Sequence, residues 1–348
     1  MRQRLITNLF LVTVLFTSCH KSEKYENASI FSFKDFKITT KLNATTIDFD
    51  EPIMRPWLFV KSDSLLIILN LRTNNMLYVY NINSREKVGE FISWGNGPND
   101  LLGIKNMQLV DSDLYLSDNQ KRTIYKYDIN DFHKSTDDII PIQKVAIDDF
   151  FSNLVYTDNG YVATAFNPEN KRLTFYNSKG EKKFSAGEYP YFGKELTHIE
   201  KMEGFRSLIA VSQKYKRIYL FGLSTDLIEI YDFQGMLIKK MHGPEQIFPQ
   251  VKEVSEGDVY RISAAGSIFT FSSLMIVDDE IYVSYSGHHQ ERGTDHPARY
   301  NILVFDMDCN PLRNYELSKP IASFTVDPVT KKIYATSNVP DYHIVIFE

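Results

Sequence analysis

A short sequence unit recurs six times along this chain of 348 residues. Each unit contains two β-like runs, and the second run ends on an aromatic residue that is followed at once by Asp, Asn or Glu. The six pairs are Tyr80-Asn81, Tyr127-Asp128, Tyr176-Asn177, Tyr231-Asp232, Phe305-Asp306 and Phe347-Glu348. The first runs of successive units begin 49, 47, 57, 63 and 52 residues apart. A repeat near this length, built from short strands, predicts a six-bladed β-propeller with one four-stranded antiparallel sheet per blade.

The two ends of the repeat region indicate how such a ring would close. The chain stops at Glu348, directly after the third strand of the sixth unit, so this unit has no fourth strand of its own. A β-like stretch within residues 30–49 belongs to no unit. We therefore predict an all-β fold in which this N-terminal stretch completes the last blade, because that closure removes two exposed sheet edges at once.

The composition fits a strand-rich and acidic protein. Aromatic residues make up 14% of the chain, which favours strands because flat rings pack well on a pleated surface. The net charge is −5, and loss of Arg2 and Arg4 with an N-terminal leader leaves 37 basic residues against 44 acidic ones. Phosphate binding needs a basic face, so we expect no nucleic-acid partner.

Residues 1–18 have the pattern of an export signal. A positively charged start precedes the mostly apolar stretch Leu5–Phe16, two small residues follow, and Cys19 comes next. The pattern resembles the lipobox of bacterial lipoproteins, in which the cysteine becomes the acylated N-terminus, although Phe16 stands where Leu is usual. An ordinary secretory signal with a chance cysteine is the alternative.

A lipid on Cys19 would place the protein in the cell envelope. Two or more acyl chains hold a protein stably on a membrane. We expect an outer-membrane lipoprotein, on either the periplasmic or the outer face, with a flexible tether over residues 19–29 and the propeller over residues 30–348. Cys309 would then have no disulfide partner, and we expect it to be a small filler in a hairpin turn.

Two sequence elements resemble a known family. The segment Leu114–Asp128 is similar to repeats of TolB-like and NHL-type six-bladed propellers, and Gly95–Asp100 looks like the Gly-x-Gly-Pro-x-Glu element of TolB-like propeller lipoproteins from Bacteroidota, with Asp100 in place of Glu. The resemblance extends over about residues 50–348. It implies a fold and a compartment, but no single activity, because propellers of this kind include binding proteins, hydrolases and lyases.

The loops between the second and third strands of a blade, and those between blades, share one face of a propeller. Exposed loops on a rigid frame are the usual place for function, and exposed aromatic rings suit contact with a sugar or a peptide. Candidate loops are 94–100, 187–193 and 242–245, with arginines near the starts of innermost strands as binders of a carboxylate or sulfate. The candidate ligand-binding residues are Trp94, Asn96, Asp100, Tyr189, Tyr191, Arg206 and His242.

The longest loop of this face, residues 287–299, is rich in histidine. The possible ligands of a divalent metal there are His288, His289, Asp295 and His296. Zinc needs three or four ligands in a tight tetrahedron, whereas adjacent histidines diverge in extended chain, so a polar surface loop is the competing interpretation. We predict no cofactor, with a divalent metal as the alternative.

Two functional hypotheses follow. The first is a membrane-anchored, non-catalytic binding or scaffold protein of the cell envelope, whose partner is a glycan, a peptide or an envelope protein. The second is a metal-assisted hydrolase or lyase that acts at the mouth of the propeller channel. A Gly-x-Ser-x-Gly nucleophile motif does not occur in the sequence, so no Ser-His-Asp triad is expected.

Overall fold

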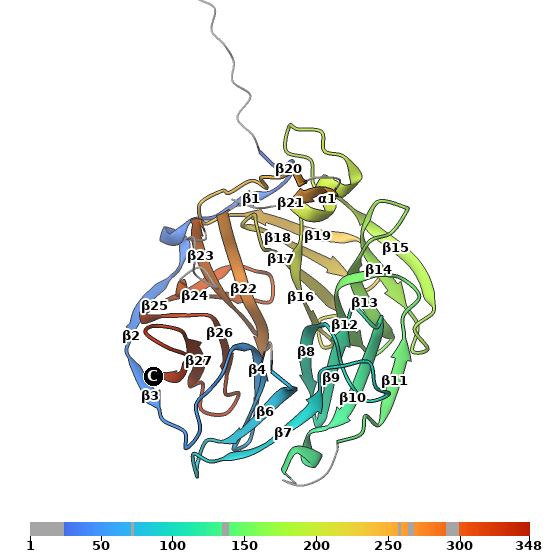
Figure 1. The fold of residues 1–348 in the computed structure, drawn as a ribbon. Helices are drawn as coiled ribbons and strands as arrows, with labels where there is room; N and C mark the ends of the chain where they lie inside the picture. The colour runs from blue at the N-terminus through green and yellow to red at the C-terminus, as the bar shows by residue number, and fades with distance from the viewer. Residues whose placement is uncertain (1–23, 71–72, 134–138, 257–258, 264–267, 290–298) are drawn as a thin grey trace, which may run out of the picture.

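The computed structural model describes residues 24–70, 73–133, 139–256, 259–263, 268–289 and 299–348. These residues form six antiparallel blades arranged around one axis (Figure 1). The predicted six-bladed β-propeller is confirmed. In every blade the first strand lies nearest the axis, and these innermost strands contact one another in a closed ring from β4 through β8, β12, β16, β22 and β26 back to β4.

The first three blades consist of consecutive strands. Blade 1 contains β4 Pro56–Ser62, β5 Leu65–Asn70, β6 Asn75–Asn81 and β7 Lys87–Ser93. Blade 2 contains β8 Ile104–Val110, β9 Asp113–Asp118, β10 Thr123–Asp128 and β11 Gln143–Ala146. Blade 3 contains β12 Phe151–Thr157, β13 Gly160–Ala165, β14 Lys171–Tyr176 and β15 Lys182–Glu188.

The other three blades take up strands from the N-terminal segment. Blade 4 contains β16 Ser207–Ser212, β17 Arg217–Gly222, β18 Leu227–Asp232, β19 Leu237–His242 and β1 Ser29–Ile30. Blade 5 contains β22 Ile268–Val277, β23 Glu280–His289, β24 Arg299–Asp306, β25 Pro311–Ile321 and β2 Ile38–Leu42. Blade 6 contains β26 Ser323–Val326, β27 Ile333–Ser337, β28 His343–Phe347 and β3 Ala44–Ile47.

Further elements lie in the connections. They are the α-helix α1 His198–Gly204, the hairpin of β20 Lys252–Glu256 and β21 Val259–Ser263, and the 3-10 helices η1 Phe33–Asp35 and η2 Ile129–His133. No helix within the described ranges is long and apolar enough to cross a membrane.

The ring closes as the sequence predicts. Strand β3 pairs antiparallel with β28, with Ala44 opposite Phe347 and Ile47 opposite Ile344, so the N-terminal segment supplies the fourth strand of blade 6. A nearly buried ion pair between Lys61 of β4 and Asp327, which follows β26, joins blade 1 to blade 6. Backbone pairing and a charge contact thus hold the two ends of the ring together.

The N-terminal segment does more than close the ring. Residues 24–47, here called the strap, run along the outer edges of three blades, since β1 pairs parallel with β19 and β2 pairs parallel with β25 (Figure 1). The expected tether over residues 19–29 was too long at its C-terminal end. Tyr25 is only 4% exposed, and its hydroxyl lies 3.1 Å from Thr225 Oγ1. The propeller therefore begins about five residues earlier than predicted, at Tyr25 rather than at residue 30.

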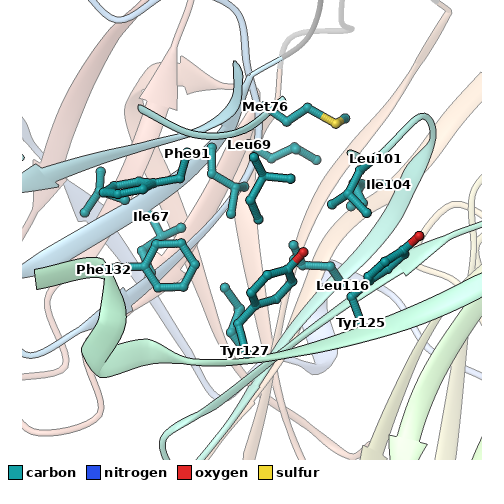
Figure 2. Packing of buried hydrophobic residues seen from close by; sticks show 14 of the residues in the cluster. Ile67, Leu69, Met76, Phe91, Leu101, Ile104, Leu116, Tyr125, Tyr127 and Phe132 are labelled. Carbon is teal, nitrogen blue, oxygen red and sulfur yellow. The ribbon is translucent and has the colours of Figure 1, made fainter. Parts of the chain in front are cut away.

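The aromatic–acid pairs serve packing and turn formation together. Figure 2 shows Tyr127 of blade 2 packed with Phe132 and Leu116 against Ile67 and Phe91 of blade 1. The acid or amide that follows the aromatic residue organises the connection to the fourth strand, as its side chain accepts hydrogen bonds from nearby backbone N–H groups in five of the blades. This double role explains why the pair recurs in each unit.

Small residues occupy several of the hairpin turns. Gly180 and Gly235 lie at the tips of two of these hairpins with φ of +85° and +80°, as expected for turn glycines. Cys309 occupies the equivalent turn of blade 5 and is fully buried without a disulfide partner. Burial raises the pKa of its thiol well above the ordinary value. The prediction of a small filler is confirmed.

Because neighbouring strands alternate in direction, the connections divide between two faces. The upper face carries the loops between second and third strands and the connections between blades, which include residues 94–103, 147–150, 189–206 and 243–251. The lower face carries the turns from first to second and from third to fourth strands.

Candidate functional site

The upper face carries most of the exposed aromatic side chains found in the described ranges. They are Trp57, Trp94, Phe150, Phe166, Tyr191 and Tyr300. The lower face and the rim expose Phe184 and Tyr215. Both tryptophans of the sequence belong to the upper set, with Trp94 62% and Trp57 39% exposed. Large exposed aromatic groups gathered on one face mark an interaction surface.

Two cations from different blades approach each other near the axis on this face. Lys105 is the second residue of β8, and Arg206 directly precedes β16. Strand β12 contacts both strands, and Asn153 Nδ2 of β12 donates a hydrogen bond of 2.9 Å to Ser207 O. Desolvation and the charge of Arg206 lower the pKa of Lys105, against a smaller opposing effect of Asp118. An anionic group bound here would relieve the repulsion between the two cations.

An aromatic pair lies on the same face. Phe150 directly precedes β12, and its carbonyl accepts a hydrogen bond of 3.2 Å from Phe166 N in the loop after β13. The Phe166 ring stacks on the imidazole of His198, with centroids 5.1 Å apart and planes 5° from parallel. His198 begins α1, whose first turn is fixed by a capping box between Thr197 and Glu200.

The predicted ligand-binding loop 94–100 is held rigidly. Asp100 Oδ2 accepts a hydrogen bond of 2.8 Å from Gly97 N, so this carboxylate shapes the loop instead of facing a ligand. A Cβ at Gly95 or Gly97 would lie 2.6 Å from the same oxygen. Neither glycine has positive φ, so the close approach of the Asp100 carboxylate, and not the backbone conformation, favours glycine at both positions. Trp94 and Asn96 remain exposed.

The predicted loop 187–193 begins later than expected, because Gly187 and Glu188 are the last two residues of β15. Tyr189 is half-buried, with its ring 5.4 Å from the Arg172 guanidinium, and burial raises the pKa of its hydroxyl. Its contacts are those of a packing residue. Tyr191 is exposed, as a ligand-binding residue requires.

A cavity of about 530 Å³ lies between this loop and the connection that follows β19. Phe192, Phe248 and Val251 line its apolar side, and Lys194 and Gln246 contribute polar groups. A second cavity, of about 420 Å³, lies near the lower edge of blade 3 and is lined by Tyr161, Phe184 and Phe233 among others. The first cavity belongs to the candidate face and the second does not.

The prediction of His242 as a loop ligand was wrong. His242 ends β19 and is 1% exposed. Its Nε2 lies 2.9 Å from Asp226 Oδ1 and 3.0 Å from Ile247 O. Asp226 also accepts hydrogen bonds from Glu245 N and Ile247 N at 2.8 and 2.7 Å. The imidazole therefore helps to hold the connection after β19 in place. It is buried and inaccessible to a ligand.

Two of the four predicted metal ligands lie in the described ranges. His288 and His289 belong to β23, where they pair with Phe269 and Ile268, so they lie in a strand and not in a loop. Asp295 and His296 lie outside the described residues. No group of three or more His, Cys, Asp or Glu side chains in the described part could hold a metal ion.

The sequence analysis identified part of this face. Trp94, Asn96, Tyr191 and Arg206 are exposed on it as predicted, the last in a weak contact of 3.5 Å with Glu203. It missed Lys105 and the Phe150–Phe166–His198 group. The sequence does contain an apolar residue, Phe150, in a connection between two blades. A lone phenylalanine, however, is more often part of the core.

Comparison with known proteins supports this architecture. A family model described as TolB-like 6-blade propeller-like matches residues 32–328. A duf4221 family member from Bacteroides vulgatus is similar in structure, with a TM-score of 0.57 and 10% identity over 89% of this chain and 96% of that one.

Two further structures of similar shape widen the comparison. A protein from Bacteroides fragilis described as exported has a TM-score of 0.54 and 12% identity, over 92% of this chain and 99% of its own. The WD40 domain of Neurospora crassa Pan2 has a TM-score of 0.51 and 11% identity, over 88% and 94%. At these identities the structures establish the fold alone. No curated protein matches the sequence.

Proposed function

The chain belongs to the TolB-like six-blade propeller family, and from this premise we propose that it is a lipid-anchored, non-catalytic binding protein of the cell envelope that contacts its partner through the upper face. The observation that carries the proposal is the gathering of six exposed aromatic side chains on that face. Trp, Tyr and Phe are the residues that supply most contact area at binding surfaces.

The polar groups beneath this face support a binding role. The Asp226 carboxylate and the His242 imidazole are buried and hydrogen-bonded to backbone groups, so they hold loops in place. The Arg172–Glu229 pair is 3% and 2% exposed and is likewise enclosed. These side chains make a rigid platform for the exposed rings, as a preformed binding surface requires.

The lipid anchor is the second part of the proposal. It rests on the lipobox-like sequence that ends at Cys19. Cells grown with radiolabelled palmitate should incorporate label into the wild-type protein and none into Cys19→Ser. Equal labelling of the two would contradict the anchor.

Site-specific photo-crosslinking in cells tests the binding face without assuming the class of partner. A photoreactive amino acid at Tyr191 should form an adduct with an envelope component, and the same group at Tyr215 on the lower face should not. Both positions are exposed tyrosines, at 46% and 38%, so access to solvent is matched. Adducts formed equally at both positions, or at Tyr215 alone, would overturn the proposal.

A further inference from the structure

We infer that the upper face rests on the membrane surface, so that the lipid bilayer itself is the partner of the aromatic side chains; this inference rests on the proposed function. Three features support it: the place where the chain enters the propeller, the number of residues between Cys19 and that point, and the side chains that the two faces expose.

The chain enters the propeller at the edge of the upper face. Tyr25 is buried between the connections that precede β16 and follow β19, with its ring 5.7 Å from Phe192 and 5.1 Å from Phe248. The Thr225 contact fixes its hydroxyl, and Lys240 Nζ donates a hydrogen bond of 3.0 Å to Glu26 O. All of these partners except Lys240 lie in upper-face connections, so the anchoring point is on that side of the ring.

The length of the tether limits how far the propeller can lie from the bilayer. Six residues from Cys19 to Tyr25 span at most about 21 Å when fully extended. The strands of a blade, commonly six or seven residues long here, cover a similar distance of about 20–23 Å between the two faces. A lipid on Cys19 therefore keeps Tyr25, at the edge of the upper face, within about 21 Å of the bilayer.

The exposed side chains distinguish a ring that lies flat from one that stands on its edge. Trp57, Trp94, Phe150, Tyr191 and Tyr300 belong to five different connections or strand starts around the upper face. Aromatic rings with one polar end are typical of the membrane–water interface. A ring standing on its edge would bring one or two of these side chains to the lipid, whereas a ring lying flat brings all of them.

Charge contributes less than the aromatic side chains. Several acids of this face are engaged within the protein: Glu188 pairs with Lys171, Glu203 with Arg206, and Glu245 accepts from the Tyr285 hydroxyl at 3.0 Å. The full chain is acidic, so no strong general attraction to an anionic surface is expected. Docking should therefore depend on inserted aromatic rings and persist when salt is raised.

The test uses the acyl-free chain from residue 20 to 348, which keeps every described contact because the described residues begin at 24. It is mixed with vesicles of phosphatidylethanolamine and phosphatidylglycerol and sedimented. The chain should co-sediment at low and at 0.5 M salt, about equally, and tryptophan emission should shift to the blue because both tryptophans lie on the docking face.

A variant and a matched control make the test specific. Trp94→Ala/Phe150→Ala/Tyr191→Ala should weaken vesicle binding by about a hundredfold, since three partly buried aromatic contacts are lost. Ile142→Ala/Tyr215→Ala/Met236→Ala, which removes three exposed side chains from the lower face, should bind as the wild type does. Circular dichroism of both variants checks that the propeller is folded.

The outcomes separate this inference from the proposed function. No vesicle binding by the wild type, or equal binding by the two triple variants, would overturn the inference, and so would binding that vanishes at 0.5 M salt. A crosslink from Tyr191 to a glycan or protein, together with no vesicle binding, would keep the binding role and remove the membrane as partner. Crosslinking at Tyr215 alone would remove both.

Discussion

The two halves of the ring are held together in different ways. Blades 4 to 6 are linked along their outer edges by one continuous strap, with β1, β2 and β3 each added to a different blade. Blades 1 to 3 end on β7, β11 and β15, with no further strand on the described chain. Blades 4 to 6 are therefore tied together by backbone hydrogen bonds between distant residues, whereas blades 1 to 3 depend on packing between neighbouring blades. The comparison locates the strap and the two junctions between halves as the places where the ring should be most sensitive.

The largest effect is expected from removal of the strap. A chain that starts at residue 48 loses three strands and the buried rings of Tyr25, Phe31 and Phe36. Loss of each large core side chain costs about 3–5 kcal/mol, and domains of this kind are stable by about 5–15 kcal/mol in all. We expect no cooperative thermal unfolding of the truncated chain by calorimetry.

A chain that starts at residue 24 is the control for this truncation, and it should melt as the mature protein does. A truncated chain with an unchanged melting temperature would show that packing between blades is sufficient in both halves. The strap would then contribute no measurable stability to blades 4 to 6.

The junction between blades 3 and 4 holds the next largest contribution. Arg172 Nε and Nη2 donate hydrogen bonds of 3.0 and 2.6 Å to Glu229 Oε2, and Tyr231 donates one of 2.6 Å to Glu229 Oε1. Glu229→Leu leaves a buried guanidinium without its counter-charge and should lower the free energy of unfolding by about 3–5 kcal/mol, measured with denaturant.

The double variant Arg172→Met/Glu229→Leu sharpens this prediction. It should recover much of the lost stability, because an apolar pair replaces the ion pair, although the Tyr231 hydroxyl loses its acceptor. A double variant that is less stable than Glu229→Leu would contradict this explanation of the junction.

The junction between blades 6 and 1 should depend on pH. Burial of Asp327 would raise the pKa of its carboxyl, but hydrogen bonds from Lys61 and from the Thr330 backbone lower the pKa to about 2. The carboxyl of an unfolded chain titrates near 3.9, so the folded state gains about 2 kcal/mol above that pH and loses it as the pH falls from about 4 to 2.

Asp327→Asn removes this gain at every pH. The free energies of unfolding of wild type and variant should therefore differ at pH 6 and converge towards pH 2.5, as followed by urea titration. Curves that stay parallel down to pH 2.5 would show that the Lys61–Asp327 pair has no part in acid sensitivity.

The smallest effect is expected at the open outer edge of blade 3. Lys183 is exposed on β15 next to Phe184, and charged side chains on an edge strand discourage pairing between molecules. Lys183→Val should change the free energy of unfolding by no more than about 0.5 kcal/mol, but it should increase self-association in analytical ultracentrifugation. Lys183→Gln should associate no more than the wild type does. Equal association of the two variants would refute a role for the charge-bearing edge.

The sequence predicts those parts of the ring in which local structure, such as a turn after a strand, requires particular residue types. The buried tyrosines of the repeat, such as Tyr80 and Tyr231, are followed by turn-forming side chains, so spacing alone revealed the blades. The pairing of β1 and β2 with blades 4 and 5 was not predicted, because the side chains of these two strands are mostly exposed and show no alternation of buried and exposed positions. Their partners, β19 and β25, are chosen by tertiary packing.

The candidate face was predicted less completely for a similar reason. Gly243 and Pro244 suggested that His242 lies in a loop, yet the Asp226 carboxylate holds its imidazole inside the blade. Lys105 became a candidate only when folding brought Arg206 towards it from another blade. A contact between residues so far apart in sequence leaves no local pattern by which to find it.

Hydrogen exchange on the acylated protein in vesicles tests the central claim most directly, namely that the upper face is the contact face. Compared with the acyl-free chain in solution, amides in residues 94–103, 189–197 and 243–251 should exchange more slowly, and the lower-face turns 213–216 and 233–236 should not change. Protection confined to the lower turns, or absent from both faces, would contradict the account.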